Sequence, residues 1–162
     1  MQPDKDLAEF ALLGLKYNLL RLEQIVTWAD DIIAERDNPP NWAIELAMVC
    51  NHEEACSILR WITGNAEADS AINLVGGLLR RRWMSNSLTW HDVTQFVWSL
   101  LYGEFANEND LPFIRFEAGY NLLIAEEEFD QNQISDADMT ALVDEILMPY
   151  DKYQSLLPTW AV

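Results

Sequence analysis

The chain has 162 residues with 27 acidic and 10 basic side chains, a net charge of −17, and half of its residues are hydrophobic. A chain this apolar can bury a core, which excludes a disordered polypeptide, and its scarcity of Lys and Arg argues against binding to nucleic acid. No apolar run approaches the roughly 20 residues of a membrane span, and the N-terminus has no basic and apolar signal region.

Apolar side chains in the first quarter of the chain recur every three or four residues, which predicts two core-facing helices. The two sets are Phe10, Leu13, Tyr17 and Leu20, and then Leu22, Ile25, Ala29 and Ile32. The segment 37–40 contains two prolines and ends the second helix, because proline cannot donate a backbone hydrogen bond. A short helix is expected over 41–49.

Asn51 is expected to cap the next helix, which would end near Gly64. A further helix should start at 66–69 and reach Met84. Its adjacent glycines, Gly76 and Gly77, indicate a close helix contact or a kink. The basic run 80–82 lies at its C-terminal end, where cations complement the helix dipole.

The second half shows the same helical pattern. Thr89 should cap a helix over 90–104, a proline at 112 should open one that ends near Phe129, and Ser135 with Asp138 resembles a capping box. We expect the last helix to end at Pro149 and the aromatic tail 150–160 to pack back on the body. Without alternating apolar and polar runs, the sequence predicts an all-α fold of about seven or eight helices in one domain over 1–162, as a bundle or stacked hairpins.

The negative charge is unevenly distributed along the chain. Residues 1–83 hold 13 acids and 8 bases, whereas residues 84–162 hold 14 acids and only two bases, a net charge of −12. Such a field opposes compaction, because like charges repel. It favours a basic partner, whose approach the field would accelerate.

No catalytic motif competes with this interpretation. His52 and Cys56 share one face of a predicted helix, but zinc requires at least one more protein ligand. His91 and Asp92 are adjacent in a helix and therefore point to different sides. We expect no enzymatic activity, no metal and no cofactor, and we expect Cys50 and Cys56 to be reduced thiols.

An acidic cluster at the end of the predicted helix 112–129 is the first candidate binding site. It consists of Glu126, Glu127, Glu128 and Asp130. Carboxylates at a helix C-terminus oppose its dipole, so their position favours a role in binding. The alternatives are a solvated acidic surface, or a carboxylate-bound metal in an enzyme.

A second candidate lies on the helix predicted over 90–104. His91, Gln95, Trp98 and Tyr102 line the side opposite its apolar stripe. Aromatic side chains with polar atoms are typical of interface hot spots. The alternative is a helix buried on both sides.

The segments 25–30 (IVTWAD) and 38–46 (NPPNWAIEL) resemble those of small helical bacterial immunity proteins, which neutralise secreted or contact-delivered toxins. The resemblance implies a cytoplasmic inhibitor of one cognate toxin. Together with the charge, it predicts a partner that is a basic nuclease, with an RNase favoured, whose active site is occluded by acidic and aromatic side chains. The alternative is an acidic adaptor or chaperone for a secreted protein, which would favour an exposed hydrophobic groove and dimerisation.

Overall fold

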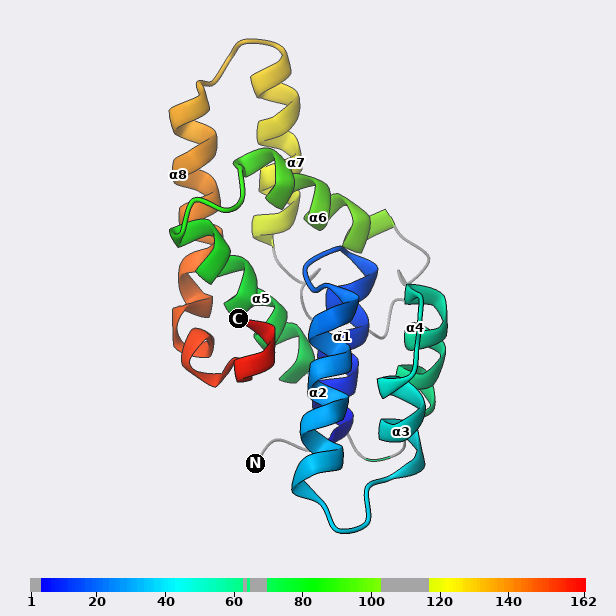
Figure 1. Ribbon diagram of the computed structural model, residues 1–162. Helices are drawn as coiled ribbons and strands as arrows, with labels where there is room; N and C mark the ends of the chain where they lie inside the picture. The colour runs from blue at the N-terminus through cyan, green and yellow to red at the C-terminus, as the bar shows by residue number, and fades with distance from the viewer. Residues whose placement is uncertain (1–3, 63, 65–69, 103–116) are drawn as a thin grey trace. The chain divides into compact units, whose positions relative to one another are not determined.

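The computed structural model describes residues 4–62, 64, 70–102 and 117–162, and the side chains of 100–102 and 117–120 lie outside this description. Over these residues the chain forms eight α-helices and the 3-10 helices η2 and η3, with no β-strand (Figure 1). The elements are α1 (Asp4–Lys16), α2 (Leu22–Glu35), α3 (Asn41–Ala47), α4 (His52–Trp61), α5 (Ser70–Met84), α6 (Trp90–Tyr102), α7 (Glu117–Asp130), α8 (Asp136–Leu147), η2 (Met148–Leu156) and η3 (Thr159–Ala161). The predicted all-α fold is confirmed. The predicted boundaries at 66–69, Glu104 and Pro112 lie outside the described residues.

The chain divides into two compact units. One comprises Met1–Val75 with Leu157–Val162, and the other comprises Gly76–Leu156, so that α5 contributes residues to both. A single domain over the whole chain stays a prediction. None of the helices in the described part has the length and apolar composition needed to span a membrane.

In the first unit, α1 packs on α4, while α2 packs on both α3 and η3. Its core consists of side chains that are almost fully buried, among them Phe10, Leu15, Ile25, Ile32, Leu46 and Leu59. The predicted cap of α4 is confirmed, because the backbone N–H of Glu54 donates to Oδ1 of Asn51 at 2.9 Å. That bond satisfies one of the N–H groups that a helix start leaves without a partner.

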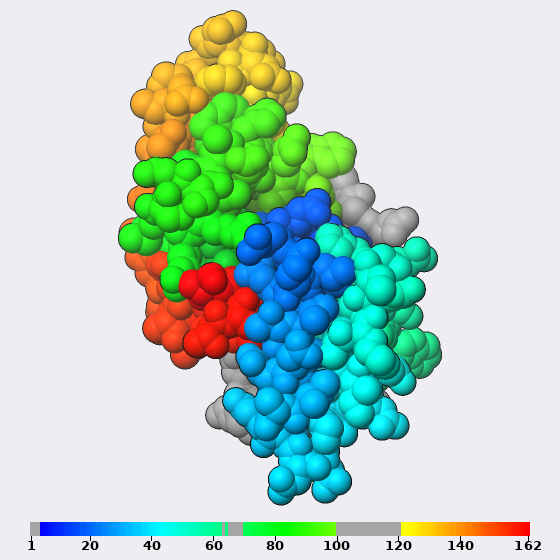
Figure 2. Space-filling model, in the orientation of Figure 1, coloured from blue at the N-terminus to red at the C-terminus, as the bar shows by residue number. Residues whose placement is uncertain are grey.

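An aromatic cluster joins the C-terminal tail to this core. The ring of Trp160 lies 5.3 Å from that of Trp28 and 5.7 Å from that of Phe10, and Trp42 lies 5.4 Å from Trp28. In Figure 2 the red atoms at the C-terminal end lie against the blue atoms of the first helices. The expectation that the tail packs back is confirmed for Trp160, which is 9% exposed.

The end of α1 differs from the prediction. The helix ends at Lys16, and Asn18 adopts the left-handed conformation at φ 56°, so Leu20 is not part of the first helix. The backbone N–H groups of Leu19 and Leu20 donate to the carbonyl of Gly14, at 2.8 and 2.9 Å. Asparagine tolerates this conformation better than other non-glycine residues do, which explains why the turn occurs there.

In the second unit, α7 and α8 form a hairpin, α6 packs on both, and η2 packs on α8 (Figure 1). Its core includes Leu78, Leu79, Val93, Phe96, Val97, Leu122, Met139, Val143, Leu147 and Tyr150. Ser135 and Asp138 form the predicted capping box, with each side chain bonded to the other's backbone N–H. Thr89 and Asp92 make the same pair of bonds before α6, so the position of Asp92 is explained by capping.

The adjacent glycines in α5 make a close contact, and the helix runs through them without a break. A Cβ atom on Gly77 would lie 2.9 Å from the backbone carbonyl carbon of Tyr153, and one on Gly76 would overlap the ring of Tyr150. Of the two predicted explanations, the close contact is therefore the correct one. Because η2 covers this part of α5 so tightly, the ring of Tyr150 is buried.

The dipole role predicted for the whole basic run is wrong for its first member. Arg80 is 7% exposed, and its guanidinium donates to Asp144 from Nη1 and to Asp151 from Nε, the latter at 2.6 Å. A buried guanidinium needs such partners, because an uncompensated charge in a protein interior is unstable. Arg81 and Arg82 do lie in the last turn of α5, where the dipole role stays a prediction.

Candidate partner-binding site

The predicted aromatic and polar face of α6 is exposed over the residues that the structure describes. His91, Gln95 and Trp98 face solvent, with Trp98 53% exposed, whereas Val93 and Phe96 are buried. The alternative of a helix buried on both sides therefore fails for these three residues. The side chain of Tyr102, the fourth predicted member, lies outside the description.

The acidic cluster at the end of α7 is spread around the helix. Glu127 and Asp130 are exposed, and Glu126 and Glu128 are half-buried. Consecutive positions on a helix point about 100° apart, so these carboxylates do not converge on one ion. The arrangement suits a broad charged surface.

One contact joins the two predicted groups. Nδ1 of His91 lies 3.8 Å from Oε1 of Glu126, an ion pair whenever the imidazole is protonated. The start of α6 and the end of α7 therefore meet, and Glu126 connects the acidic candidate to the His91 side of α6. The role of this surface in binding stays a prediction.

Trp90 extends this surface to α8, and the sequence interpretation did not single it out. Its ring packs edge-to-face on Phe129, with centroids 4.8 Å apart, and its indole N–H donates to Oδ1 of Asp136 at 2.7 Å. Trp90 therefore touches both helices of the α7–α8 hairpin. The available signal was a tryptophan at the first position of a capped helix, where an apolar side chain needs a tertiary contact.

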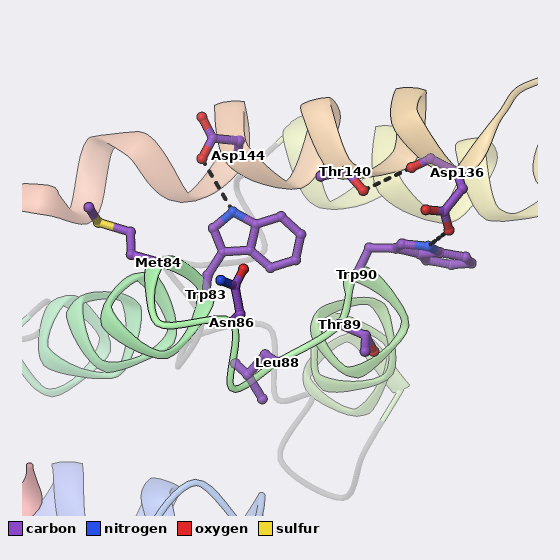
Figure 3. Close-up of a pocket in the computed structure, with 9 residues that line it drawn as sticks. All are labelled: Trp83, Met84, Asn86, Leu88, Thr89, Trp90, Asp136, Thr140 and Asp144. Atoms are coloured by element: carbon purple, nitrogen blue, oxygen red, sulfur yellow. Dashed lines mark hydrogen bonds between the residues drawn. The ribbon is translucent and has the colours of Figure 1, made fainter.

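A pocket of about 500 Å³, open to solvent, lies between the loop that joins α5 to α6 and one face of α8 (Figure 3). Its lining comprises Trp83, Met84, Asn86, Leu88, Thr89, Trp90, Asp136, Thr140 and Asp144. The three residues from α8 are four positions apart, so they share one helix face. Two indoles and two carboxylates thus line a single cavity.

Two tryptophan–aspartate hydrogen bonds define opposite ends of the pocket. At one end the indole N–H of Trp83 donates to Oδ1 of Asp144 at 3.2 Å, and at the other Trp90 donates to Asp136 (Figure 3). Eight residues separate the two aspartates, which corresponds to about 12 Å along a helix axis. A ligand group can therefore reach one carboxylate without reaching the other.

The two carboxylates differ in their electrostatic surroundings. Hydrogen bonding from Arg80 is the main reason why the pKa of Asp144 lies below its ordinary value of 3.8. The Asp136 carboxylate pairs with no basic side chain in the described part of the chain, and the hydrogen bond that it accepts there comes from the indole of Trp90. The end of the pocket at Asp136 is therefore the more attractive one for a cation.

The cysteines and the metal-ligand side chains are the remaining candidates for chemistry. Burial raises the pKa of the Cys56 thiol, which disfavours the reactive thiolate. No group of three or more His, Cys, Asp or Glu side chains lies in metal-binding proximity within the ranges that the structure describes. Cys50 and Cys56 are both free thiols.

Comparison with known proteins adds no functional assignment. No protein-family model matches the chain, and neither a curated protein nor a solved structure is significantly similar to it.

Proposed function

We propose that this protein is a cytoplasmic immunity protein that binds a basic toxin and blocks its active site. The observation that carries the proposal is the surface at which the exposed His91 of α6 meets Glu126 at the acidic end of α7. This surface lies in the half of the chain with 14 acids and two bases. Charge concentrated in this way accelerates association with a partner of opposite sign.

The toxin that best fits such a surface is a nuclease, and we favour an RNase. Enzymes that cleave nucleic acids bind phosphates with Lys and Arg, so an acidic inhibitor can place carboxylates where phosphates would bind. Trp98 supplies exposed aromatic area on the same helix as His91. In interfaces, a few aromatic anchors of this kind carry much of the affinity.

The segments that resemble those of immunity proteins support the proposal through their sequence. They lie in α2, the following turn and α3, and their tryptophans, Trp28 and Trp42, pack on each other. These residues therefore build the first unit. The acidic surface comes from the second unit.

The experiment is to recover the partner by affinity capture and to titrate it against two charge-reversed variants. The test variant replaces Glu126, Glu127, Glu128 and Asp130 by Lys. The control replaces four exposed carboxylates of the first unit, Asp30, Asp31, Glu35 and Asp37, by Lys. Both variants change the net charge equally, so they separate a local effect from a general one.

The proposal predicts slower association and weaker binding for the test variant, and smaller losses for the control. The slow association should be most evident at low salt, where the Debye length is longest. Equal effects of both variants would contradict this site. Recovery of a neutral or acidic partner, or of an unfolded secreted protein bound to a dimer of this chain, would contradict the immunity function.

A further inference from the structure

The pocket between α8 and the loop before α6 brings tryptophan side chains from one side together with carboxylates from the other. Its two ends are indoles held by carboxylates, and Thr140 lies between those carboxylates on α8 (Figure 3). In the described structure both hydrogen bonds use Oδ1 of the aspartate, so Oδ2 of Asp136 remains an available acceptor. A flat aromatic surface beside an available carboxylate oxygen is suited to a planar cation.

We propose that this pocket binds an arginine side chain of the basic partner, with its guanidinium at Asp136 and Trp90. Only the source of the arginine rests on the proposed function. The pocket adjoins the acidic surface through Trp90, which contacts both His91 and Phe129. One partner can therefore cover the surface and insert an arginine into the pocket.

Electrostatics places the cation at the Asp136 end. Asp144 is already compensated by Arg80, and that buried guanidinium would repel a second cation nearby. Asp136 has no such neighbour among the residues described. The pocket is therefore asymmetric, with one end built into the fold and the other open to a ligand.

The chemistry of the lining favours arginine over lysine. A guanidinium is planar, stacks on indole rings and presents several N–H donors in one plane, whereas an ammonium is a compact and strongly hydrated charge. The lining offers two indole rings together with the side-chain oxygens of Asn86 and Thr140. The volume of about 500 Å³ also leaves room for the peptide on either side of the arginine.

The test needs no toxin. The peptide acetyl-Gly-Arg-Gly-amide is titrated into the ¹⁵N-labelled protein while the tryptophan indole N–H signals are followed by NMR. The citrulline peptide, which has almost the same shape but no charge, is titrated in parallel. The Asp136→Asn variant keeps an oxygen for the Trp90 indole and removes the charge, and Glu145→Gln removes an exposed α8 carboxylate that does not line the pocket.

We expect a saturable shift of the Trp90 signal with arginine, and binding at least about fivefold weaker for citrulline and for Asp136→Asn, because the charge pair is lost. Glu145→Gln should bind as the wild type does. The inference is overturned if the Trp90 signal does not move, or if citrulline binds equally well. It is also overturned if Asp136→Asn, still folded by its NMR spectrum, binds arginine unchanged.

Binding measurements with the partner and with the peptide distinguish a failure of this inference from a failure of the proposed function. If the toxin binds and Asp136→Asn leaves its affinity unchanged, the immunity function stands and the pocket assignment is wrong. If the arginine peptide binds but no basic partner exists, the proposed function is wrong, and the assignment of the pocket as a guanidinium site stands.

Discussion

A Cβ atom on Gly76 would lie 2.5 Å from Cε1 of Tyr150, so α5 and η2 meet at a position that only glycine can occupy without displacement. Glycine normally weakens a helix by about 1 kcal/mol relative to alanine. The close approach explains why it is nevertheless found in the middle of α5. It also fixes the ring of Tyr150 in the core of the second unit.

We expect Gly76→Ala to destabilise the protein by about 1–3 kcal/mol, because overpacking outweighs the gain in helix propensity. Urea unfolding followed by circular dichroism measures the change. In a Tyr150→Leu background the cost of the same substitution should shrink, because the ring that it displaces is gone. A more stable Gly76→Ala protein would show that the contact is looser than described.

The ion pairs of Arg80 predict that removing its two partners and removing Arg80 itself destabilise the protein to different extents. Asp144 and Asp151 have side chains 56% and 51% exposed, whereas that of Arg80 is 9% exposed. Removing both carboxylates with Asn leaves a buried guanidinium uncompensated, at a cost of about 3 kcal/mol. Arg80→Met should cost less, because the two carboxylates return to water. Urea unfolding of both variants, with Glu145→Gln as a control, tests the order, and the reverse order would contradict it.

Local features of this fold could be predicted from the sequence. The caps at Asn51, Thr89 and Ser135 depend on residues three positions apart, so a segment of four residues is enough to predict each of them. The end of α1 was missed because the apolar spacing continues from Phe10 to Leu20 across the turn at Asn18. The spacing of apolar residues indicates which side chains are buried, but it does not indicate where the backbone turns and a helix ends.

The pairings between distant residues could not be predicted in this way. Trp83 and Asp144 are 61 positions apart, and Trp90 and Asp136 are 46 apart. Arg80 has the sequence signature of a dipole partner, and only the fold brings Asp144 and Asp151 to it. The acidic and aromatic surfaces were recognised from local patterns, whereas the pocket beside them requires the packing of α8 against the loop before α6.

Acidification should weaken the contribution of Asp144. Hydrogen bonding to Arg80 sets its pKa in the folded protein below the ordinary 3.8 that the unfolded chain retains. The stabilisation is therefore complete above 3.8 and is lost as the pH falls through the folded value. The difference in unfolding free energy between wild type and Asp144→Asn should be constant above about pH 5 and shrink below about pH 4. A difference that stays constant down to about pH 3 would contradict the assignment.

Two exposed tryptophans test whether binding depends on position or only on exposure. Trp61 in the first unit is 81% exposed, and Trp98 in the second is 53% exposed. If exposed aromatic area alone attracted the partner, Trp61→Ala would weaken binding more. We expect the opposite, because only Trp98 lies on the helix face whose His91 contacts the acidic end of α7.

Trp98→Ala should therefore cost about 2 kcal/mol of binding free energy, a loss of roughly 30-fold, as for a typical aromatic hot spot. Trp61→Ala should change the affinity by less than about threefold. Isothermal titration calorimetry with the captured partner measures both losses, and circular dichroism confirms that both variants remain folded. A larger loss for Trp61→Ala would move the binding surface to the first unit and leave the acidic half as solvated surface.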